Sequence, residues 1–390
     1  MTGVHTPLWL RPAVAPERWC RRILSATPEV RGRTIMPTHT RAAIKIEHGM
    51  PLVIEEIVLA DPGPDEVLIK LFASGICHSQ LHQIHNPRQA MPALLGHEAT
   101  GVVLAAGRAV THVREGDRVM VPFVPRDLPE GLTTAGRTTF TLRGEQYSAG
   151  VYTWAEHTLA NEQMVVPLPN DVPTDVTAIV GCAVITGVGA VLHTAQVREG
   201  QSVVVFGVGG VGVNILAGAK IVGAYPIIAV DLQEAKLGYA KRMGATHVVN
   251  ASEVNPVEAI KELTGGGADF AFDAIGLPSV TAQALGSVTA GVLGVRRGGT
   301  AVSVGIGQEA ISVPAGMFPF GERSLIGSMG GSARPAQVMP QYIDWYREGK
   351  LPLEAMISKR YDGLDHINEG VRALEAGEIE GRSIMVYSQP

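Results

Sequence analysis

The apolar positions in the first half of the chain follow short alternating patterns that predict β-strands. Glu66–Ser74 alternates in this way and is rich in residues that favour strands. The turn sequence Asp61-Pro62-Gly63-Pro64-Asp65 precedes it. Further expected strands are Arg41–Glu47, Leu52–Val58, Gly101–Ala105 and Asp117–Val121. This half therefore predicts an irregular, strand-rich domain.

From about Thr177 the pattern changes, and strand-like apolar runs alternate with helical stretches. Ser202–Phe206 predicts a buried strand, and the glycines after it lead into an expected helix that ends near Val222. Later strands are expected at Pro226–Val230, His247–Val249, Phe270–Asp273 and Thr300–Val304, with a helix at Glu234–Met243. This alternation predicts an α/β fold with a doubly wound parallel sheet. The final residues predict helices near Gln337–Glu348 and Gly363–Ala376 and a closing strand at Arg382–Tyr387.

Composition and charge exclude several classes of function. Of the 390 residues, 46% are hydrophobic and 18% are charged, which is typical of a globular protein. The net charge of -5 gives no reason to expect nucleic acid or an anionic membrane as a partner. Two uncharged windows, Val176–His193 and Gly200–Ala219, are long enough to span a membrane. Both are rich in glycine, and we interpret them as buried strands and helices.

The first 35 residues differ from the rest because their charged residues are mostly arginine. They contain no secretory apolar segment, and no amphipathic pattern supports an organelle transit peptide. We expect a disordered tail, or a translation start upstream of the true one at Met36. The cysteines, Cys20, Cys77 and Cys182, are too few for a disulfide framework. A reducing compartment, the cytoplasm, is therefore expected.

A glycine motif follows the expected strand Ser202–Phe206 and opens the next helix. In Gly207-Val208-Gly209-Gly210-Val211-Gly212, Gly207 permits a tight turn and Gly209 allows the backbone to approach a pyrophosphate. Gly212 allows the helix to pack closely on the strand. The N-terminus of the helix then presents free N–H groups to phosphates. This spacing between strand and helix predicts a dinucleotide site.

A carboxylate stands where such a site would need one. Asp231 ends the next expected strand and can accept hydrogen bonds from the adenosine ribose hydroxyls. A 2′-phosphate would be repelled, so the coenzyme expected is NAD rather than NADP. Lys236 could lie near the same ribose. An ordinary buried glycine turn beside an unrelated surface aspartate is the competing interpretation.

Three scattered residues are candidate metal ligands. Cys77, His97 and Cys182 are ambiguous one by one, since free cysteines are often small buried apolar residues. Two thiolates and one imidazole with an open fourth position, however, form a known type of catalytic zinc site. Soft sulfur ligands also favour zinc over magnesium or calcium.

The sequence around these residues resembles the medium-chain zinc-dependent alcohol dehydrogenases. The resemblance covers Met36 to Pro390 and rests on several motifs in one order. They are Gly75-Ile76-Cys77-His78-Ser79, Gly96-His97-Glu98, Gly116-Asp117-Arg118-Val119, Gly181-Cys182 with Thr186-Gly187, the glycine motif, Thr264-Gly265-Gly266-Gly267-Ala268-Asp269, and Gly377–Arg382. The resemblance implies oxidation of an alcohol, or reduction of an aldehyde or ketone, with one catalytic Zn²⁺ per subunit and NAD. It also implies three segments, namely a catalytic part at 36–183, a Rossmann-type NAD-binding domain at 184–322 and a second catalytic part at 323–390.

The resemblance also implies a role for each matching residue. Cys77, His97 and Cys182 would bind zinc, and the substrate oxygen or water would take the fourth position. Ser79 would bind the substrate hydroxyl, and His82 would end a proton relay to solvent. The remaining implied residues are His78 and Arg382 near the pyrophosphate, Thr186 near the nicotinamide, and Phe123 and Ile306 in the substrate or nicotinamide pocket.

The chain departs from many relatives at two places. The stretch from Pro125 to Phe140 contains no cysteine, so the structural zinc of many relatives is not expected here. Gln80 replaces an aspartate that orients the zinc-bound histidine in many relatives. A carboxylate partner raises the basicity of a histidine ligand, so we hypothesise that Gln80 leaves the zinc more electrophilic.

Two other functions are compatible with parts of this sequence. A thiol-adduct formaldehyde dehydrogenase of the same fold would need an anion-binding pocket, which the sequence does not locate. A catalytically silent NAD-binding relative should have lost ligands or Asp231, but all are present. The expected partners are a small alcohol or aldehyde, with no nucleic acid and no membrane, and a second copy of the chain in a homodimer or homotetramer. The substrate itself cannot be read from the sequence.

Overall fold

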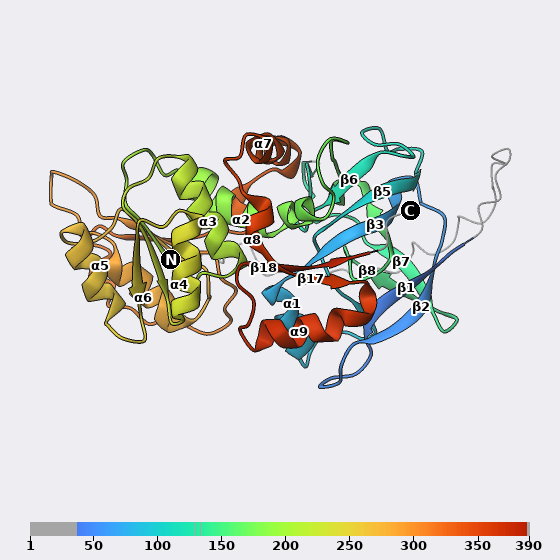
Figure 1. The fold of residues 1–390 in the computed structure, drawn as a ribbon, viewed down its shortest axis with the longest axis horizontal. Coiled ribbons are helices and arrows are strands. Elements are labelled where there is room, and N and C mark those ends of the chain that lie inside the picture. Colours follow the sequence, from blue (N-terminus) through green and yellow to red (C-terminus); the bar gives the residue numbers. More distant parts are fainter. Residues whose placement is uncertain (1–36, 129, 133, 388–390) are drawn as a thin grey trace, which may run out of the picture. The chain divides into compact units, whose positions relative to one another are not determined.

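The second half of the chain folds around a six-stranded parallel sheet (Figure 1). The computed structural model describes residues 37–128, 130–132 and 134–387, so the expected tail at 1–35 lies outside them. The strand order is β13-β12-β11-β14-β15-β16. The strands are β11 (Val203–Phe206), β12 (Ile227–Asp231), β13 (His247–Asn250), β14 (Phe270–Asp273), β15 (Thr300–Ser303) and β16 (Ser324–Gly327).

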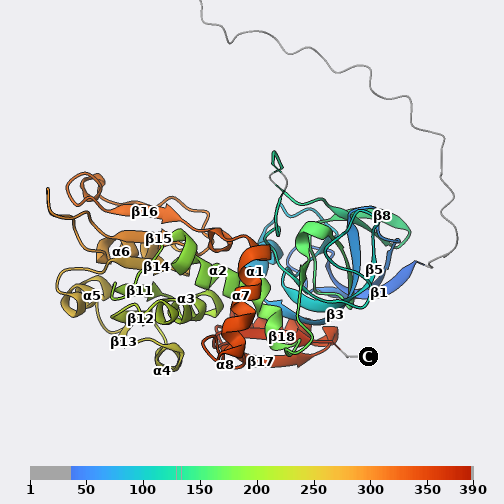
Figure 2. The same ribbon diagram turned by 90° about the horizontal axis from the view of Figure 1, so that it is seen from above.

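Helices cover both faces of this sheet. Val203 and Val205 of β11 share a core with the helices α3 and α4, whereas Val204 and Phe206 share a core with α5 and α6. Successive side chains of a strand point to opposite faces, so a strand covered on both sides is apolar throughout. The helices are α3 (Gly210–Ile221), α4 (Glu234–Met243), α5 (Pro256–Thr264) and α6 (Pro278–Ser287). Figure 2 shows α5 and α3 on opposite sides of the strands β11 and β12.

The first half of the chain forms two further sheets. A five-stranded antiparallel sheet has the order β4-β1-β2-β7-β8, and a seven-stranded sheet has the order β10-β6-β5-β3-β18-β17, with β9 also paired to β3. Their strands are β1 (Thr38–Lys45), β2 (Val53–Leu59), β3 (Glu66–Ile76), β4 (Ala93–Leu94), β5 (Ala99–Ala106), β6 (Arg118–Val121), β7 (Thr138–Leu142), β8 (Glu145–Ala149), β9 (His157–Asn161), β10 (Val166–Pro167), β17 (Ile357–Asp362) and β18 (Arg382–Val386). The last two strands return the end of the chain to the first half, where β18 pairs antiparallel with β3.

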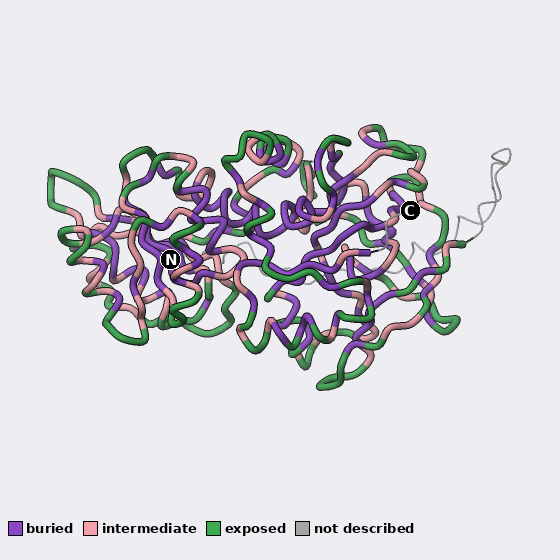
Figure 3. Tube along the Cα trace, viewed as in Figure 1, coloured by how far each residue is buried: buried purple, intermediate pink, exposed green. Residues whose placement is uncertain are grey.

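The long strand β3 organises this strand-rich part. Ile69 and Leu71 lie in one apolar core with the fully buried Trp154, while Leu68 lies in another with Phe140. Figure 3 shows that buried residues follow the strands in both halves and that the exposed residues lie mostly in loops. The carboxyl end of β3 is therefore held firmly by its neighbours, and the candidate metal ligand Cys77 comes directly after it.

The remaining helices connect these layers. The described helices and helical turns outside the parallel sheet are α1 (His78–His85), η1 (Glu162–Met164), η2 (Val176–Gly181), α2 (Ala183–Gly189), η3 (Ala190–Thr194), η4 (Ala315–Met317), η5 (Gly330–Ser332), α7 (Pro335–Arg347), α8 (Leu353–Met356), η6 (Leu364–His366) and α9 (Ile367–Glu375). Two glycines let backbones approach closely here. A Cβ added to Gly189 would lie 2.8 Å from Gly331 Cα, and one added to Gly187 would lie 2.5 Å from Asn214 Cβ.

The strand-rich first half and the parallel sheet of the second half confirm the fold expected from the pattern. Neither uncharged window is a single long helix. Residues 176–193 form η2, α2 and most of η3, and residues 200–219 form β11, the glycine turn and most of α3. No helix within the described ranges is long and apolar enough to cross a membrane. The pairing of β16 with β15 carries the parallel sheet beyond residue 322, and the division into three segments stays a prediction.

Candidate metal and coenzyme site

Three residues far apart in sequence converge where several elements begin or end. Cys77 follows β3, His97 lies between β4 and β5, and Cys182 lies between η2 and α2. Their ligand atoms all lie within 4.8 Å of one another. The two sulfurs are 3.8 Å apart and buried, and His97 Nε2 lies 3.1 Å from Cys182 Sγ. The structure thus brings together the three residues that the sequence predicts as ligands.

These distances fit a tetrahedral zinc ion. With Zn–S bonds of about 2.3 Å and tetrahedral angles, two sulfur ligands lie about 3.8 Å apart. The observed separation of Cys77 Sγ and Cys182 Sγ is 3.8 Å. The donor set of two thiols and one imidazole matches zinc better than magnesium or calcium. The residues present therefore fit a zinc site that is bound by three side chains and leaves a fourth position free.

The two buried thiols lie within hydrogen-bond distance of each other and shift each other's pKa in opposite directions. The hydrogen bond with Cys182 lowers the pKa of Cys77, and the nearby Arg382 guanidinium acts in the same direction. The same hydrogen bond raises the pKa of Cys182. Ser79 Oγ donates a further hydrogen bond to Cys77 Sγ at 3.2 Å. Cys77 is therefore the sulfur that carries negative charge first, and that is the form that binds a cation.

Arg382 and Glu98 form a buried ion pair close to the cysteines. Arg382 Nε donates to Glu98 Oε1 at 2.7 Å, and both side chains are buried. Glu98 Oε2 also accepts from the backbone N–H of Ala183 at 3.3 Å, at the start of α2. Burial raises the pKa of Glu98. Burial alone would lower the pKa of Arg382, but the negative charges of Cys77, Glu98 and Cys182 outweigh it and raise the pKa.

Gln80 contacts the imidazole of His97 from the side away from the sulfurs. Its Nε2 lies 2.6 Å from His97 Nδ1, and its Oε1 accepts from the backbone N–H of Gly96 at 2.6 Å. The side chain is only 3% exposed. The glutamine noted in the sequence is therefore a direct neighbour of the candidate histidine ligand.

The glycine motif forms the expected turn between strand and helix. Gly207 has φ of 90°, a conformation that side-chain-bearing residues rarely adopt, and α3 begins at Gly210. A Cβ on Gly212 would lie 1.9 Å from the carbonyl oxygen of Gly207, so only glycine fits there. Asp231 Oδ2 accepts from the backbone N–H of Val208 at 2.8 Å and so braces the turn. The carboxylate that we expected to face a ribose therefore also supports the glycine motif.

One cleft of about 1200 Å³ connects the glycine turn with the cysteines. Every residue that the sequence predicts as a site residue lines it except Gly212, which is buried beneath the turn. His78 and His82 lie on α1 with ring centroids 5.7 Å apart, and Lys236 lies on α4 near Asp231. Thr186 Oγ1 is buried without a hydrogen-bond partner among the described residues. Such an atom is ready to bind a ligand polar group.

The pocket residues lie on different sides of this cleft. The Phe123 ring meets the His97 ring edge to face, with centroids 5.5 Å apart. Ile306 is 45% exposed and lies in the loop after β15. Arg382 also approaches the glycine turn, because a Cβ on Gly210 would lie 3.1 Å from its Nη1. The expected position of Arg382 near the pyrophosphate and its pairing with Glu98 are thus compatible.

Sequence reasoning did not find all residues of the cleft. Arg137 and Met329 line it as well, although they lie far apart in the chain and belong to no motif. Arg137 precedes β7 and donates through Nε to Ser148 Oγ and through Nη2 to Ser148 O, both at 2.9 Å. Its place depends on the hairpin of β7 and β8, which the alternation of apolar residues did not predict.

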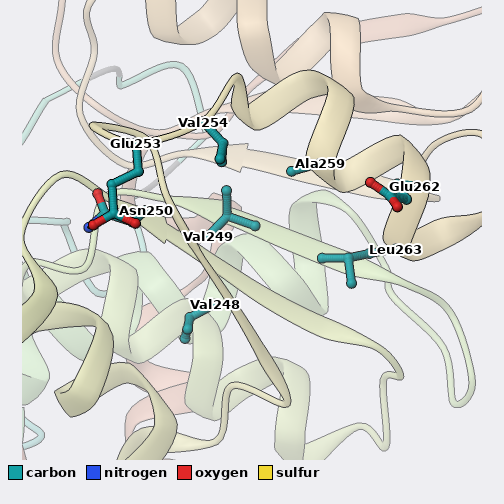
Figure 4. A pocket seen from close by; sticks show the side chains of 8 residues that line it. All are labelled: Val248, Val249, Asn250, Glu253, Val254, Ala259, Glu262 and Leu263. Atoms are coloured by element: carbon teal, nitrogen blue, oxygen red, sulfur yellow. The ribbon is translucent and has the colours of Figure 1, made fainter.

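A second pocket of about 390 Å³ lies between the edge strand β13 of the parallel sheet and α5 (Figure 4). Val249, Asn250 and Glu253 line it from β13 and the following turn, and Leu263 lines it from α5. None of the predicted site residues lies there. Its polar side chains also bind one another, since Asn250 Nδ2 donates to Glu253 Oε1 at 3.1 Å.

Comparison with known proteins gives consistent matches along the chain. Residues 63–170 match the family "Alcohol dehydrogenase GroES-like domain", and residues 210–348 match "Zinc-binding dehydrogenase". The chain is 35% identical over 382 residues to an alcohol dehydrogenase class-3 of Cereibacter sphaeroides, covering 89% of this chain and 100% of the relative. It is 33% identical, with the same coverage, to an S-(hydroxymethyl)glutathione dehydrogenase of Paracoccus denitrificans.

Solved structures agree with these matches. A zinc-binding domain protein of the alcohol dehydrogenase type from Burkholderia ambifaria superposes with a TM-score of 0.83 at 28% identity, covering 91% of this chain and 100% of the other. Benzyl alcohol dehydrogenase from Acinetobacter calcoaceticus superposes with a TM-score of 0.80 at 28% identity, covering 90% of this chain and 100% of the other.

Proposed function

Because this chain belongs to the medium-chain zinc-dependent alcohol dehydrogenase family, we propose that it transfers a hydride between an alcohol and NAD at the cleft of Cys77, His97 and Cys182. Membership in the family makes it an oxidoreductase that acts on CH–OH donors. The single observation that carries the proposal is that one cleft is lined both by the three candidate ligands and by the glycine turn.

The residues of the cleft have different proposed roles in the reaction. A zinc ion here would supply Lewis-acid polarisation of the alcohol or carbonyl oxygen. Ser79 Oγ lies next to Cys77 Sγ and can relay a proton, taking one from an alcohol in the cleft as it passes its own hydroxyl proton on. His82 lies on the same helix, exposed and at the cleft wall, and can pass that proton to solvent. Phe123 and Ile306 would orient the substrate and exclude water, while His78, Thr186 and Arg382 would hold the coenzyme.

A zinc analysis combined with an NAD reduction assay tests this function. The purified protein should contain one zinc per chain and should reduce NAD with some of a panel of primary, secondary, allylic and aromatic alcohols. His97→Ala should lose both zinc and activity, because only two side-chain ligands would remain. His85→Ala changes an exposed histidine at the end of α1, which is not one of the three candidate ligands, and should retain both. Full activity in protein stripped of metal would overturn the proposal.

We further propose that NAD is preferred over NADP. Asp231 lines the cleft at the end of β12, where a 2′-phosphate would meet its negative charge. Asp231→Ser should therefore raise the ratio of kcat/KM with NADP to that with NAD at least about tenfold. Glu234→Gln removes an exposed carboxylate from the start of α4 and should leave the ratio unchanged. An unchanged ratio in Asp231→Ser would exclude a selecting role for this carboxylate.

A second candidate substrate is a thiol adduct of formaldehyde, and one observation favours it. The sequence did not locate an anion-binding group, but Arg137 lines the cleft. Ser148 accepts bonds from Nε and Nη2, and Nη1 has no hydrogen-bond partner among the described residues. The relative from Paracoccus denitrificans is named as an S-(hydroxymethyl)glutathione dehydrogenase. Arg137 would bind a carboxylate of such an adduct.

Formaldehyde oxidation with and without glutathione separates the two substrates. If the adduct is the substrate, NAD reduction should require glutathione, and Arg137→Met should raise the adduct's KM while leaving kcat for a neutral alcohol unchanged. Arg143→Met removes an arginine that instead pairs with Glu55 outside the cleft, and should change neither. Turnover of neutral alcohols alone, indifferent to Arg137, would leave the plain alcohol dehydrogenase as the function.

We also propose a homodimer or homotetramer in the cytoplasm. The edge strand β16 pairs only with β15 among the described residues. Leu293 is 94% exposed and Phe320 is 88% exposed, in the loops on either side of β15. An apolar edge of this kind favours pairing with a second copy. Leu293→Asp with Phe320→Asp should lower the mass measured by light scattering, from two chains to one for a homodimer or from four chains to two for a homotetramer. An unchanged mass would place the interface elsewhere.

A further inference from the structure

The surroundings of His97 Nδ1 carry an inference beyond the proposed function, on which it rests. A histidine that binds a metal through Nε2 has its proton on Nδ1, and that proton needs an acceptor. Among the described residues, the side chain within hydrogen-bond distance of Nδ1 is Gln80, whose amide nitrogen lies 2.6 Å away. An amide nitrogen donates and does not accept.

The backbone of Gly96 determines which end of the Gln80 amide is oxygen. Its N–H lies 2.6 Å from Oε1, and an N–H group requires an acceptor at that distance. The amide nitrogen at the other end therefore faces His97. Gln80 is 3% exposed and Gly96 is buried, so solvent does not replace either contact.

This arrangement matches the other tautomer of the imidazole. With its proton on Nε2, His97 accepts from Gln80 at Nδ1 and donates to Cys182 Sγ at 3.1 Å. The hydrogen bonds then run from the N–H of Gly96 through Gln80 and His97 to Cys182 Sγ, and each donor in this series has an acceptor. In that tautomer, however, Nε2 carries hydrogen and has no lone pair for a metal.

Moving the proton to Nδ1 leaves one donor without an acceptor. If the amide keeps its orientation, its NH₂ group meets Nδ1–H. If the amide turns over, its NH₂ group meets the N–H of Gly96. One carbonyl oxygen could accept both protons only if the side chain moved, because the two donors lie at opposite ends of the amide. A carboxylate would have an oxygen for each donor.

We propose that Gln80 is a positioning residue that holds His97 in the tautomer unable to bind metal, so that the chain binds zinc less tightly than its ligand set alone would. The amide hydrogen bonds that stabilise the competing tautomer must be given up when Nε2 binds a metal. The protein would then exchange zinc readily while keeping a complete set of ligands.

Zinc affinity in Gln80 variants, measured by competition with a chelating dye, tests the inference without an activity assay. Gln80→Met removes the opposing donor without adding charge and should bind zinc more tightly than the unmodified chain. Gln80→Glu has the same shape and offers two acceptors, and should bind zinc about 10- to 100-fold more tightly. Zinc affinity is thus expected to be highest in Gln80→Glu, lower in Gln80→Met and lowest in the unmodified chain. Circular dichroism of each variant before and after adding zinc checks folding.

The opposite order would overturn the inference. If Gln80 supports the metal, Gln80→Met must bind zinc more weakly than the unmodified chain. Gln83→Glu adds the same charge at an exposed position on the same helix and should change the affinity less than about twofold. If Gln83→Glu raised zinc affinity as much as Gln80→Glu does, the added negative charge alone would explain the effect. Failure of the unmodified chain to bind zinc at all would instead reject the proposed function.

Discussion

At the scale of single residues, buried charge organises the candidate site. Glu98 and Arg382 are both buried beside Cys77, and neither could be there alone because an unpaired buried charge is strongly destabilising. Their pairing joins Arg382, the first residue of β18, to Glu98, which directly precedes β5. The guanidinium also lowers the pKa of Cys77, so the pair acts on the chemistry of the site as well as on its shape.

Ser79 permits a direct test of the proton path. Ser79→Ala should lower kcat for alcohol oxidation about 10²- to 10⁴-fold, because no hydroxyl beside Cys77 Sγ could then relay the substrate proton onward. Zinc content should stay at one per chain, since Ser79 is not one of the three candidate ligands. Steady-state rates and metal analysis measure the two effects separately. Ser79→Thr keeps a hydroxyl and should retain most of the activity, and a loss in Ser79→Ala below about tenfold would remove Ser79 from the path.

At the scale of elements, close backbone contacts determine how α3 meets β11. The first turn of α3 lies against the carbonyl oxygen of Gly207, and no side chain fits between them. The same helix packs on α2 through Gly187, so the helix that presents the glycine turn is held on two sides. These contacts aim the N-terminus of α3 into the cleft, where its free N–H groups can meet a phosphate.

Two glycine-to-alanine substitutions separate packing from helix propensity. Gly212→Ala should lower the free energy of unfolding by about 1–3 kcal/mol, because the added Cβ would overlap Gly207 O. It should also weaken NAD binding by displacing the turn. Gly238→Ala in α4 meets nothing within 4 Å and should raise the free energy of unfolding by about 0.5–1 kcal/mol. Urea denaturation and NAD titration provide both measurements. Equal effects of the two substitutions would contradict the close-packing argument.

At the scale of the whole molecule, partly buried histidines make the free energy of unfolding depend on pH. Burial lowers the pKa of His112, His157 and His193 below the usual value of about 6.5. As the pH falls through this value, the unfolded chain takes up protons before the folded one does. The free energy of unfolding should therefore fall as the pH is lowered from about 7.5 towards the depressed pKa values, and level off below them.

His157→Gln should make this dependence shallower. The substitution removes one of the three histidines and keeps a polar group beside Thr40, whose Oγ1 lies 3.0 Å from His157 Nδ1. Urea unfolding between about pH 7.5 and pH 5.5 measures the slope, with zinc in excess in every sample. His48→Gln changes an exposed histidine in the turn between β1 and β2 and serves as the control. Identical slopes for both variants would show that burial of His157 does not contribute.

The sequence determined much of the molecule by itself. Alternation of apolar runs is a local property, so the strands β11, β12 and β14 and the glycine turn were predicted close to their observed bounds. The ligand types followed from the chemistry of thiol and imidazole groups, although their convergence was expected from a resemblance and not from spacing. Whether Gln80 helps or opposes the metal was not readable from residue type alone.

The tertiary structure decided whatever depends on residues far apart in the chain. The β7–β8 hairpin brings Arg137 to the cleft, and β18 brings Arg382 to Glu98. Gln80 meets His97 and Gly96 at once only because α1 packs against the loop before β5. Periodicity reports which face of an element is buried, whereas a contact between distant segments depends on how all the elements pack. Hydrogen-bond partners are set by that packing, and the chemistry of His97 therefore depends on it.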